Sequence, residues 1–305
     1  MIRPSETAFA HNLDAQLSAF SQNVTALPGV DDPIKRWVLV EQLIESKRRV
    51  DFVATLQKLS LSDDRANPHS DIFDPIRGAI TLIRRNDEEE AFWLLYLATQ
   101  FSKHSVDGWK LTRAVYGRLG TSPYWKWPTV SAHPSQFADW VSDNYSTLKN
   151  HRFGNHRKYE TLKPNSRRGL GAAVKDYVER ISVYGTQRDA IERKIAGLND
   201  PHTQFERLFS FFNENLSWGR LATFDHVTML QKVGLIGAIP GRTFLNGATG
   251  PRNGVDLLLS DVSLTIKQKE SVIVELAGQL KLGQQEMEDA LCNWQKSPSK
   301  FIAFR

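Results

Sequence analysis

The sequence contains a single cysteine, Cys292, and this scarcity excludes several kinds of site. One cysteine forms no intramolecular disulfide and supplies no cysteine-rich zinc centre within the chain, and this fits a reducing compartment. The eight histidines are scattered, and no His-Glu-x-x-His motif occurs. His151 and His156 lie close together, but inside a basic segment, and we interpret them as part of that segment. We therefore predict no metal site.

Long apolar runs are also absent. The densest one, residues 91–98, is far shorter than the roughly 20 residues that cross a bilayer. The first residues, Met1 to Thr7, lack the apolar core of a signal peptide. We therefore expect a cytoplasmic protein that makes no contact with a membrane.

The fingerprints of several common enzyme classes are missing as well. The chain has no Walker loop, no G-x-G-x-x-G dinucleotide fingerprint and no G-x-S-x-G nucleophile elbow. Zinc-dependent base deamination lacks its cysteine ligands. No metal or organic cofactor is therefore implied.

Positive charge is present, and it is concentrated in one segment. The chain carries a net charge of +5, and residues 149–168 alone carry +6, because they hold seven cations against one acid, Glu160. The cations are Lys149, Arg152, Arg157, Lys158, Lys163, Arg167 and Arg168. A concentrated basic patch is what contact with nucleic-acid phosphates requires. The alternative interpretation is a solvated basic loop.

Helical periodicity dominates the chain, and 305 residues suffice for one large domain or two smaller lobes. We predict an all-α protein with two helical lobes, residues 1–150 and 151–305. Residues 86–90 are acidic or capping residues before an apolar run, so we interpret their acids as structural. A helix is also expected from Phe224 to Val233. Residues 255–266 fit either a short strand pair or the second half of a helical hairpin.

The motif Phe153 to Glu160 combines cations, an imidazole and an amide directly after a glycine turn. Arg157 offers a bidentate fork to a phosphate or a base edge, and Lys158 offers a point charge. Asn155 has the donor and acceptor that read an extruded base, and flanking aromatic rings stack on one. The alternative interpretation is a helix start with Asn155 as its cap.

Two carboxylates are candidates for catalysis. In the last expected helix, Asp289, Asn293 and Lys296 share the face opposite to a buried stripe of Met287, Ala290, Leu291 and Trp294. Such a triplet either stabilises a developing cation and places a water, or is a solvated helix face. Asp225 stands where a helix is expected to begin, next to a histidine. It is either a helix cap or a catalytic acid.

Two glycine-rich turns are candidate phosphate sites. Residues 245–252 contain Gly247, Gly250 and Arg252, and residues 169–174 form a second turn of this kind. Exposed backbone N–H groups at a turn that leads into a helix bind phosphate. Either turn fits the hairpin of a helix-hairpin-helix.

Several stretches carry a resemblance to a known family: Ala91–Phe101, Gly108–Trp109, Val115–Gly120, Phe153–Glu160, Phe224–Asp225, Thr228–Leu230, Gly247–Pro251 and Asp289–Pro298. Together they resemble the alpha-glutamyl/putrescinyl thymine pyrophosphorylase family, third clade. The resemblance runs from about residue 90 to the C-terminus. Gln100 and Ser102 stand where we expect His and Gly in this family.

The resemblance implies a two-lobed architecture like that of helix-hairpin-helix DNA glycosylases. It also implies action on a hypermodified pyrimidine in phage DNA, since some members are thought to excise such bases as antiviral defence. Our first hypothesis is therefore a monofunctional DNA N-glycosylase. A lyase with Lys296 or Lys158 as nucleophile is less favoured, because neither lysine has an obvious desolvated setting.

The hypothesis assigns roles to named residues, with double-stranded DNA carrying modified bases as the partner. The catalytic carboxylate is Asp289 or Asp225. Base contacts are assigned to Asn155, His156, Tyr159 and Asn293. DNA contacts are assigned to Arg152, Arg157, Lys158, Arg167, Arg168, Gly247, Gly250, Arg252 and Lys296. The oligomeric state is not predicted.

Two other functions stay open. One is a transferase that acts on a pyrophosphorylated hydroxymethyl pyrimidine and leaves the glycosidic bond intact. The other is a DNA-binding module without catalysis, in which Asp225 and Asp289 are dispensable.

Overall fold

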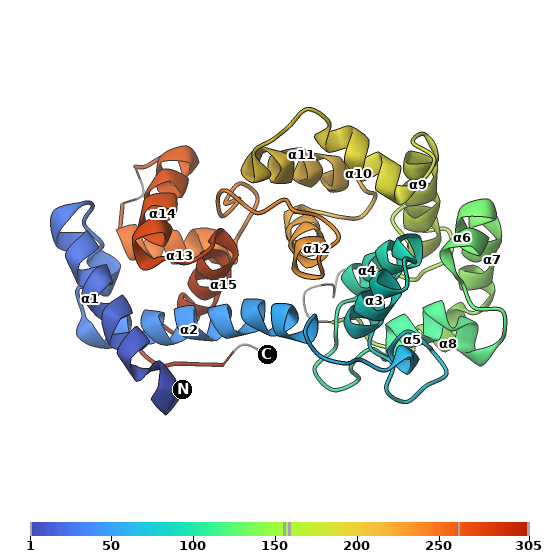
Figure 1. Cartoon of the computed structure of the whole chain (residues 1–305), viewed down its shortest axis with the longest axis horizontal. Helices are drawn as coiled ribbons and strands as arrows, with labels where there is room; N and C mark the ends of the chain where they lie inside the picture. Colours follow the sequence, from blue (N-terminus) through green and yellow to red (C-terminus); the bar gives the residue numbers. More distant parts are fainter. Residues whose placement is uncertain (1, 155–156, 158–159, 262, 304–305) are drawn as a thin grey trace. The chain divides into compact units, whose positions relative to one another are not determined.

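The computed structural model describes residues 2–154, 157, 160–261 and 263–303. Over these residues the chain forms fifteen α-helices and no strand, which confirms the all-α prediction (Figure 1). The strand pair considered for residues 255–266 is wrong, because helix α13 runs through Leu259 and α14 begins at Ile266. A helix-hairpin-helix within this fold stays a prediction. None of the helices in the described part of the chain has both the length and the apolarity that a bilayer crossing requires.

Residue contacts divide the chain into two compact units. The terminal unit combines Met1–Ala54 with Pro240–Arg305, and the central unit is Thr55–Ile239. These boundaries differ from the expected division at residue 150. The two ends of the chain join in one unit because their helices share one apolar core.

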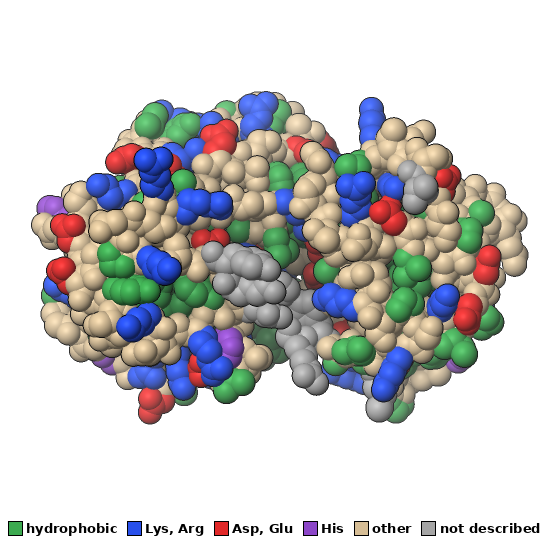
Figure 2. Space-filling view, turned by 180° about the vertical axis from the view of Figure 1, so that it is seen from behind, with side chains coloured by type: hydrophobic (Ala, Val, Ile, Leu, Met, Phe, Trp, Pro, Cys, Tyr) green, Lys and Arg blue, Asp and Glu red, His purple; other side chains and the backbone are tan. Residues whose placement is uncertain are grey.

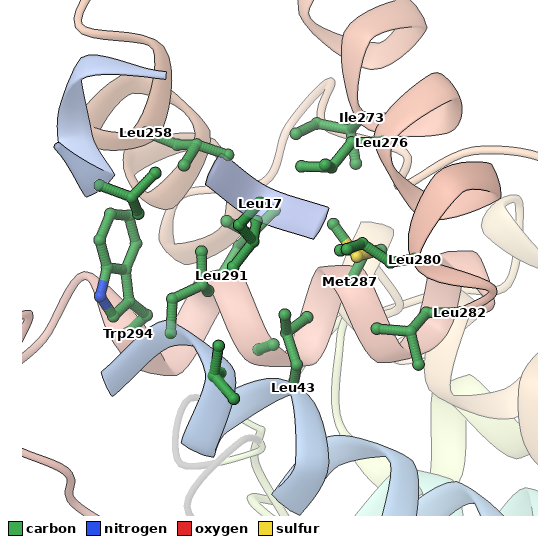
Figure 3. Packing of buried hydrophobic residues seen from close by; sticks show 14 of the residues in the cluster. Leu17, Leu43, Leu258, Ile273, Leu276, Leu280, Leu282, Met287, Leu291 and Trp294 are labelled. Atoms are coloured by element: carbon green, nitrogen blue, oxygen red, sulfur yellow. The ribbon is translucent and has the colours of Figure 1, made fainter. Parts of the chain in front are cut away.

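The terminal unit holds the first two helices and the last three. They are α1 (Thr7–Asn23), α2 (Pro33–Leu56), α13 (Gly250–Leu259), α14 (Ile266–Leu280) and α15 (Gln284–Trp294). Figure 3 shows side chains from these helices converging on one core, with Leu17, Leu43 and Leu291 fully buried. Full burial of one such side chain contributes roughly 1.5–3 kcal/mol. The Trp294 indole is also buried and donates its Nε1–H to the Lys35 carbonyl at 3.0 Å.

Two glycines let backbones approach closely in the terminal unit. A Cβ at Gly254 of α13 would overlap the carbonyl oxygen of Leu291 in α15. A Cβ at Gly29, in the turn between α1 and α2, would overlap the carbonyl oxygen of Leu257. Both helix contacts around α13 therefore depend on positions without a side chain.

The central unit contains the remaining helices. They are α3 (Pro75–Arg84), α4 (Glu88–Phe101), α5 (Lys110–Tyr116), α6 (Trp127–Ala132), α7 (Pro134–Asp143), α8 (Tyr145–Leu148), α9 (Leu170–Ser182), α10 (Gln187–Ile195), α11 (Pro201–Asn213) and α12 (Arg220–Lys232). Helix α4 is its centre, because every residue from Glu90 to Phe101 is buried. It packs against α3, α5, α10 and α12.

The acids at the start of α4 are structural, as expected. Glu90 is buried and accepts hydrogen bonds from the Tyr116 hydroxyl at 2.7 Å and the Trp127 amide at 2.9 Å. Burial raises the pKa of Glu90 to about 7, although these two hydrogen bonds oppose the shift. Glu89 accepts from the amides of Gln187 and Arg188 and so caps the first turn of α10.

Candidate functional site

The carboxylate of Asp225 lies in the second turn of α12. The helix begins at Arg220, so the expected start at Phe224 is wrong, and Asp225 does not cap it. The helix starts earlier because Ala222 and Thr223 are already buried on its inner face. The Asp225 side chain is 44% exposed and accepts a hydrogen bond from Nη2 of Arg157 at 3.2 Å.

The buried side chain of Arg157 donates the hydrogen bond to the Asp225 carboxylate. Its side chain is only 4% exposed, and its Nε donates to the Thr99 carbonyl at 2.9 Å. Helix α4 ends at Phe101, so this carbonyl is one of the last four, which lack partners within the helix. The guanidinium thus joins the end of α4 to α12. This burial sets Arg157 apart from the exposed cations with which the sequence analysis grouped it.

His226, the residue after Asp225, is buried against aromatic side chains. Its Nδ1 lies 3.1 Å from the Thr99 hydroxyl, and its ring makes edge contacts with Phe212 and Trp218. Burial, and to a lesser degree the Arg157 charge, lowers the pKa of His226 to about 3. The imidazole is therefore neutral near pH 7 and does not act as a cation beside Asp225.

Glu160 is a second acid at this place, and the sequence analysis gave it no role. It is half-buried, and Gln100 Nε2 lies 3.5 Å from its Oε2. Burial raises the pKa of Glu160, although hydrogen bonds from Ser217 and Gln100 and the charges of Arg157 and Arg168 oppose the shift. Its only sequence signal is that it is the single acid in the basic segment.

Gln100 organises the polar end of α4. Its Oε1 accepts the indole N–H of Trp218 at 2.7 Å, and its Nε2 lies 3.5 Å from the Ser217 hydroxyl. Ser217 has a left-handed backbone, with φ of +72°, and its carbonyl accepts from Arg168 at 3.3 Å. The position where the resemblance leads us to expect His therefore carries a buried amide that joins three elements.

We call Asp225, Arg157, Glu160, Gln100 and Arg168 the carboxylate site. Two acids stand beside one buried guanidinium, and their surroundings differ: Asp225 reaches solvent, whereas Glu160 is partly desolvated. A raised pKa favours the protonated form of Glu160, so this acid is suited to donating a proton.

The other predicted residues of the basic segment have varied surroundings. Arg152 is exposed and its Nε donates to Asp107 at 2.6 Å, and Arg167 and Arg168 are exposed. Asn155, His156, Lys158 and Tyr159 lie outside the described residues. On the face shown in Figure 2, lysine and arginine side chains are interspersed with acids.

A hollow of about 220 Å³ opens where the basic segment meets α9. Lys163 and Lys175 line it together with Gly169 and Gly171 of the second glycine-rich turn. Gly169 is the N-cap of α9 and has no side chain with which to cap that helix.

The second candidate carboxylate, Asp289, belongs to the terminal unit. Its Oδ2 lies 3.0 Å from Nη2 of Arg49 and 3.4 Å from the Ser46 hydroxyl, so α15 is tied to α2. Asn293, on the same helix, is buried and its Oδ1 accepts from Nζ of Lys296 at 3.0 Å. The buried stripe predicted for this helix is confirmed at Met287, Ala290, Leu291 and Trp294.

The first glycine-rich turn leads into α13, as expected. Gly247 is exposed with φ of +75°, and Gly250 is the first residue of the helix. Arg252 is exposed, and its Nε lies 3.9 Å from Oδ2 of Asp256. Among the described residues, no group of three or more His, Cys, Asp or Glu side chains is arranged to hold a metal ion.

The fold and these sites are those of an all-α protein with partly exposed, cation-paired carboxylates. A comparison with protein families matches residues 34–305 to the family alpha-glutamyl/putrescinyl thymine pyrophosphorylase clade 3. The chain belongs to this family, and the resemblance stated from its sequence is confirmed. Comparisons with curated proteins and with solved structures gave no match. The family's name describes an enzyme of modified thymine.

Proposed function

We propose that the protein is a DNA N-glycosylase that extrudes a hypermodified pyrimidine from phage DNA and excises it as antiviral defence, leaving an abasic site. The observation that carries this proposal is the carboxylate site. There, a half-exposed Asp225 is held by a buried arginine beside a second, partly desolvated acid. Cleavage of an N-glycosidic bond requires a carboxylate that faces a cationic sugar, and a proton for the departing base.

The proposed step uses the two acids differently. The bond between C1′ and the pyrimidine nitrogen breaks, and its electron pair leaves with the base, which takes a proton from Glu160. The Asp225 carboxylate stabilises the oxocarbenium-like sugar and accepts a proton from the water that bonds to C1′. Arg157 orients Asp225, because one of its nitrogens is hydrogen-bonded to the Thr99 carbonyl while another donates to the Asp225 carboxylate.

The same proposal assigns the DNA contacts. The exposed cations Arg152, Arg167 and Arg168, with Lys158, contact phosphates. Gly247, Gly250, Arg252 and Lys296 form a second phosphate contact in the terminal unit. Asn155, His156 and Tyr159 contact the base, and Asn293 is a further candidate for that role.

Asp289 is the competing candidate for the catalytic carboxylate. Like Asp225 it is paired with an arginine, and the neighbouring Glu286 also has a pKa raised by burial. We favour Asp225 because its site shares Arg157, Glu160 and Arg168 with the concentrated basic segment.

A second function is favoured by the name of the family. In this alternative the protein is a transferase, and the carboxylate site presents a pyrophosphorylated hydroxymethyl pyrimidine to an amine or amino-acid nucleophile. The basic residues then hold the leaving pyrophosphate, and the glycosidic bond survives.

The test is to incubate the purified protein with duplexes that carry hypermodified pyrimidines, with an unmodified duplex as control. Mass spectrometry detects released base, and alkali cleaves the strand at abasic sites. Released base with alkali-labile strands supports the glycosylase. A changed base mass with intact glycosidic bonds supports the transferase instead. If no duplex is changed but the protein still binds DNA, the result would support a DNA-binding module without catalysis.

A further inference from the structure

A five-residue turn closed by hydrogen bonds follows the end of α4 in the central unit. The amide of His104 donates to the Gly108 carbonyl at 3.0 Å, and the Gly108 amide donates back at 2.9 Å. Inside the turn, Nδ1 of His104 accepts the amides of Val106 at 3.2 Å and Asp107 at 3.0 Å. Because Nδ1 accepts two amide hydrogens, it carries none itself. The turn is therefore closed at its ends and hydrogen-bonded in its interior.

Asp107 anchors the same turn to the basic segment. Its Oδ2 accepts from Nε of Arg152 at 2.6 Å, and its Oδ1 lies 3.6 Å from Nζ of Lys110. The Arg152 guanidinium holds the pKa of Asp107 at about 2. The carboxylate is thus ionised at neutral pH, and its bond to Arg152 attaches the turn to the basic segment.

Val106 stands at the tip of this turn with 76% of its surface exposed. No other large apolar side chain in the described part of the chain is more exposed. Isolated exposed apolar residues are common. This one differs because it stands on a turn closed by hydrogen bonds and because exposed cations lie on that turn or are bonded to it. Lys103, Lys110 and Arg152 are all exposed around the turn.

The turn follows helix α4, whose last residues contact the carboxylate site. Thr99, whose carbonyl binds Arg157, lies in the last turn of α4, and the Gly154 amide donates to the Phe101 carbonyl at 2.8 Å. A Cβ at Gly154 would lie 2.6 Å from Cβ of Ser102, so the basic segment packs against the base of the turn.

We propose that Val106 is a wedge that enters the base stack of duplex DNA while a nucleotide is extruded toward the carboxylate site. This inference rests on the proposed function. Extrusion opens a gap in the stack, and an apolar side chain inserted there compensates for the lost stacking. A β-branched side chain has few χ1 rotamers, so it loses little side-chain freedom on insertion. The exposed cations Lys103, Lys110 and Arg152 fit contacts with phosphates beside the gap.

The test uses a duplex with one tetrahydrofuran abasic analogue, in which the gap exists without chemistry, and a matched intact duplex. The wild-type protein should prefer the gapped duplex, and Val106→Ala should reduce that preference by about tenfold. Val106→Leu should retain it. Val183→Ala is the matched control, because Val183 is 74% exposed in the same unit, and it should leave the preference unchanged.

A second readout separates this inference from the proposed function. In a duplex with 2-aminopurine beside the modified base, extrusion raises fluorescence, and Val106→Ala should lower that rise while Val183→Ala does not. If Val106→Ala changes neither the preference nor the fluorescence of a protein that excises base, the wedge is wrong and the glycosylase stands. If the Val106 effects appear but no base is released from any duplex, the wedge stands and excision is wrong.

Discussion

Arg157 and Arg167 belong to the same basic segment, yet Arg157 is almost fully buried and Arg167 is exposed. The charge pattern showed that the segment is basic, but it did not distinguish a cation that binds within the protein from one that is exposed to solvent. The same applies to Glu160, which the sequence shows only as one acid among cations. Its role in the site depends on Gln100 and Ser217, which lie far from it in the sequence.

This difference predicts different effects of two substitutions. Arg157→Ala should lower the free energy of unfolding by about 1–3 kcal/mol, because it leaves the buried Thr99 carbonyl without its donor. Arg167→Ala should leave stability unchanged but reduce the slope of DNA affinity against salt by about one phosphate contact. Urea denaturation and binding titrations at several salt concentrations measure the two effects. Equal loss of stability in both variants would contradict the structural assignment.

Glu90 makes stability depend on pH. Its pKa of about 7 in the folded protein lies above the ordinary value of 4.5. The protonated acid is therefore favoured by folding, and its contribution is fully present below pH 4.5 and lost as pH rises through 7. The loss amounts to at most about 3 kcal/mol at 1.36 kcal/mol per pKa unit.

Denaturation between pH 5 and 8 tests this expectation. The free energy of unfolding of the wild type should fall across that window more steeply than that of Glu90→Gln. Parallel profiles for the two proteins would show that Glu90 does not titrate as described.

At the scale of elements, the sequence predicts that a helix is present better than it predicts where the helix ends or which other helices it packs against. Helix α11 is Pro201–Asn213, and the sequence indicates it well, because its apolar positions repeat at helical spacing and Asp200 caps its start. Helix α12 was expected to begin at Phe224, since Gly219 precedes it without a side-chain cap that would mark the start. The crossing of α13 and α15 at Gly254 depends on a long-range contact, which periodicity does not encode.

The close approach of α13 and α15 yields a paired prediction. Gly254→Ala should destabilise the protein by about 1–3 kcal/mol, because its Cβ would overlap the Leu291 carbonyl. Gly278→Ala, in α14, meets nothing within 4 Å and should raise stability by up to about 1 kcal/mol through helix propensity. Urea denaturation of both variants and the wild type measures these changes in the free energy of unfolding. A neutral Gly254→Ala would mean that α13 and α15 lie further apart.

At the scale of the whole molecule, the chain ends combine in one unit and its middle forms the other. The all-α class followed from periodicity, whereas this pairing of distant segments did not. No change in composition marks residue 54, and the glycine-rich stretch around residue 240 does not indicate which distant helices pack together. The two candidate carboxylates consequently belong to different units: Asp225 to the central one and Asp289 to the terminal one. A substitution of Asp225 therefore tests whether the central unit carries the catalytic carboxylate, and a substitution of Asp289 tests the terminal unit.

The most direct measurement is the rate of base release, under single-turnover conditions, from DNA with a hypermodified pyrimidine. The wild type, Asp225→Asn and Asp289→Asn are compared, with circular dichroism to show that each is folded. The account predicts that Asp225→Asn slows release at least about 100-fold while Asp289→Asn stays within about threefold of wild type. Release that survives in Asp225→Asn but is lost in Asp289→Asn would place the chemistry in the terminal unit. Intact glycosidic bonds with the wild-type protein on every modified duplex would contradict the glycosylase itself.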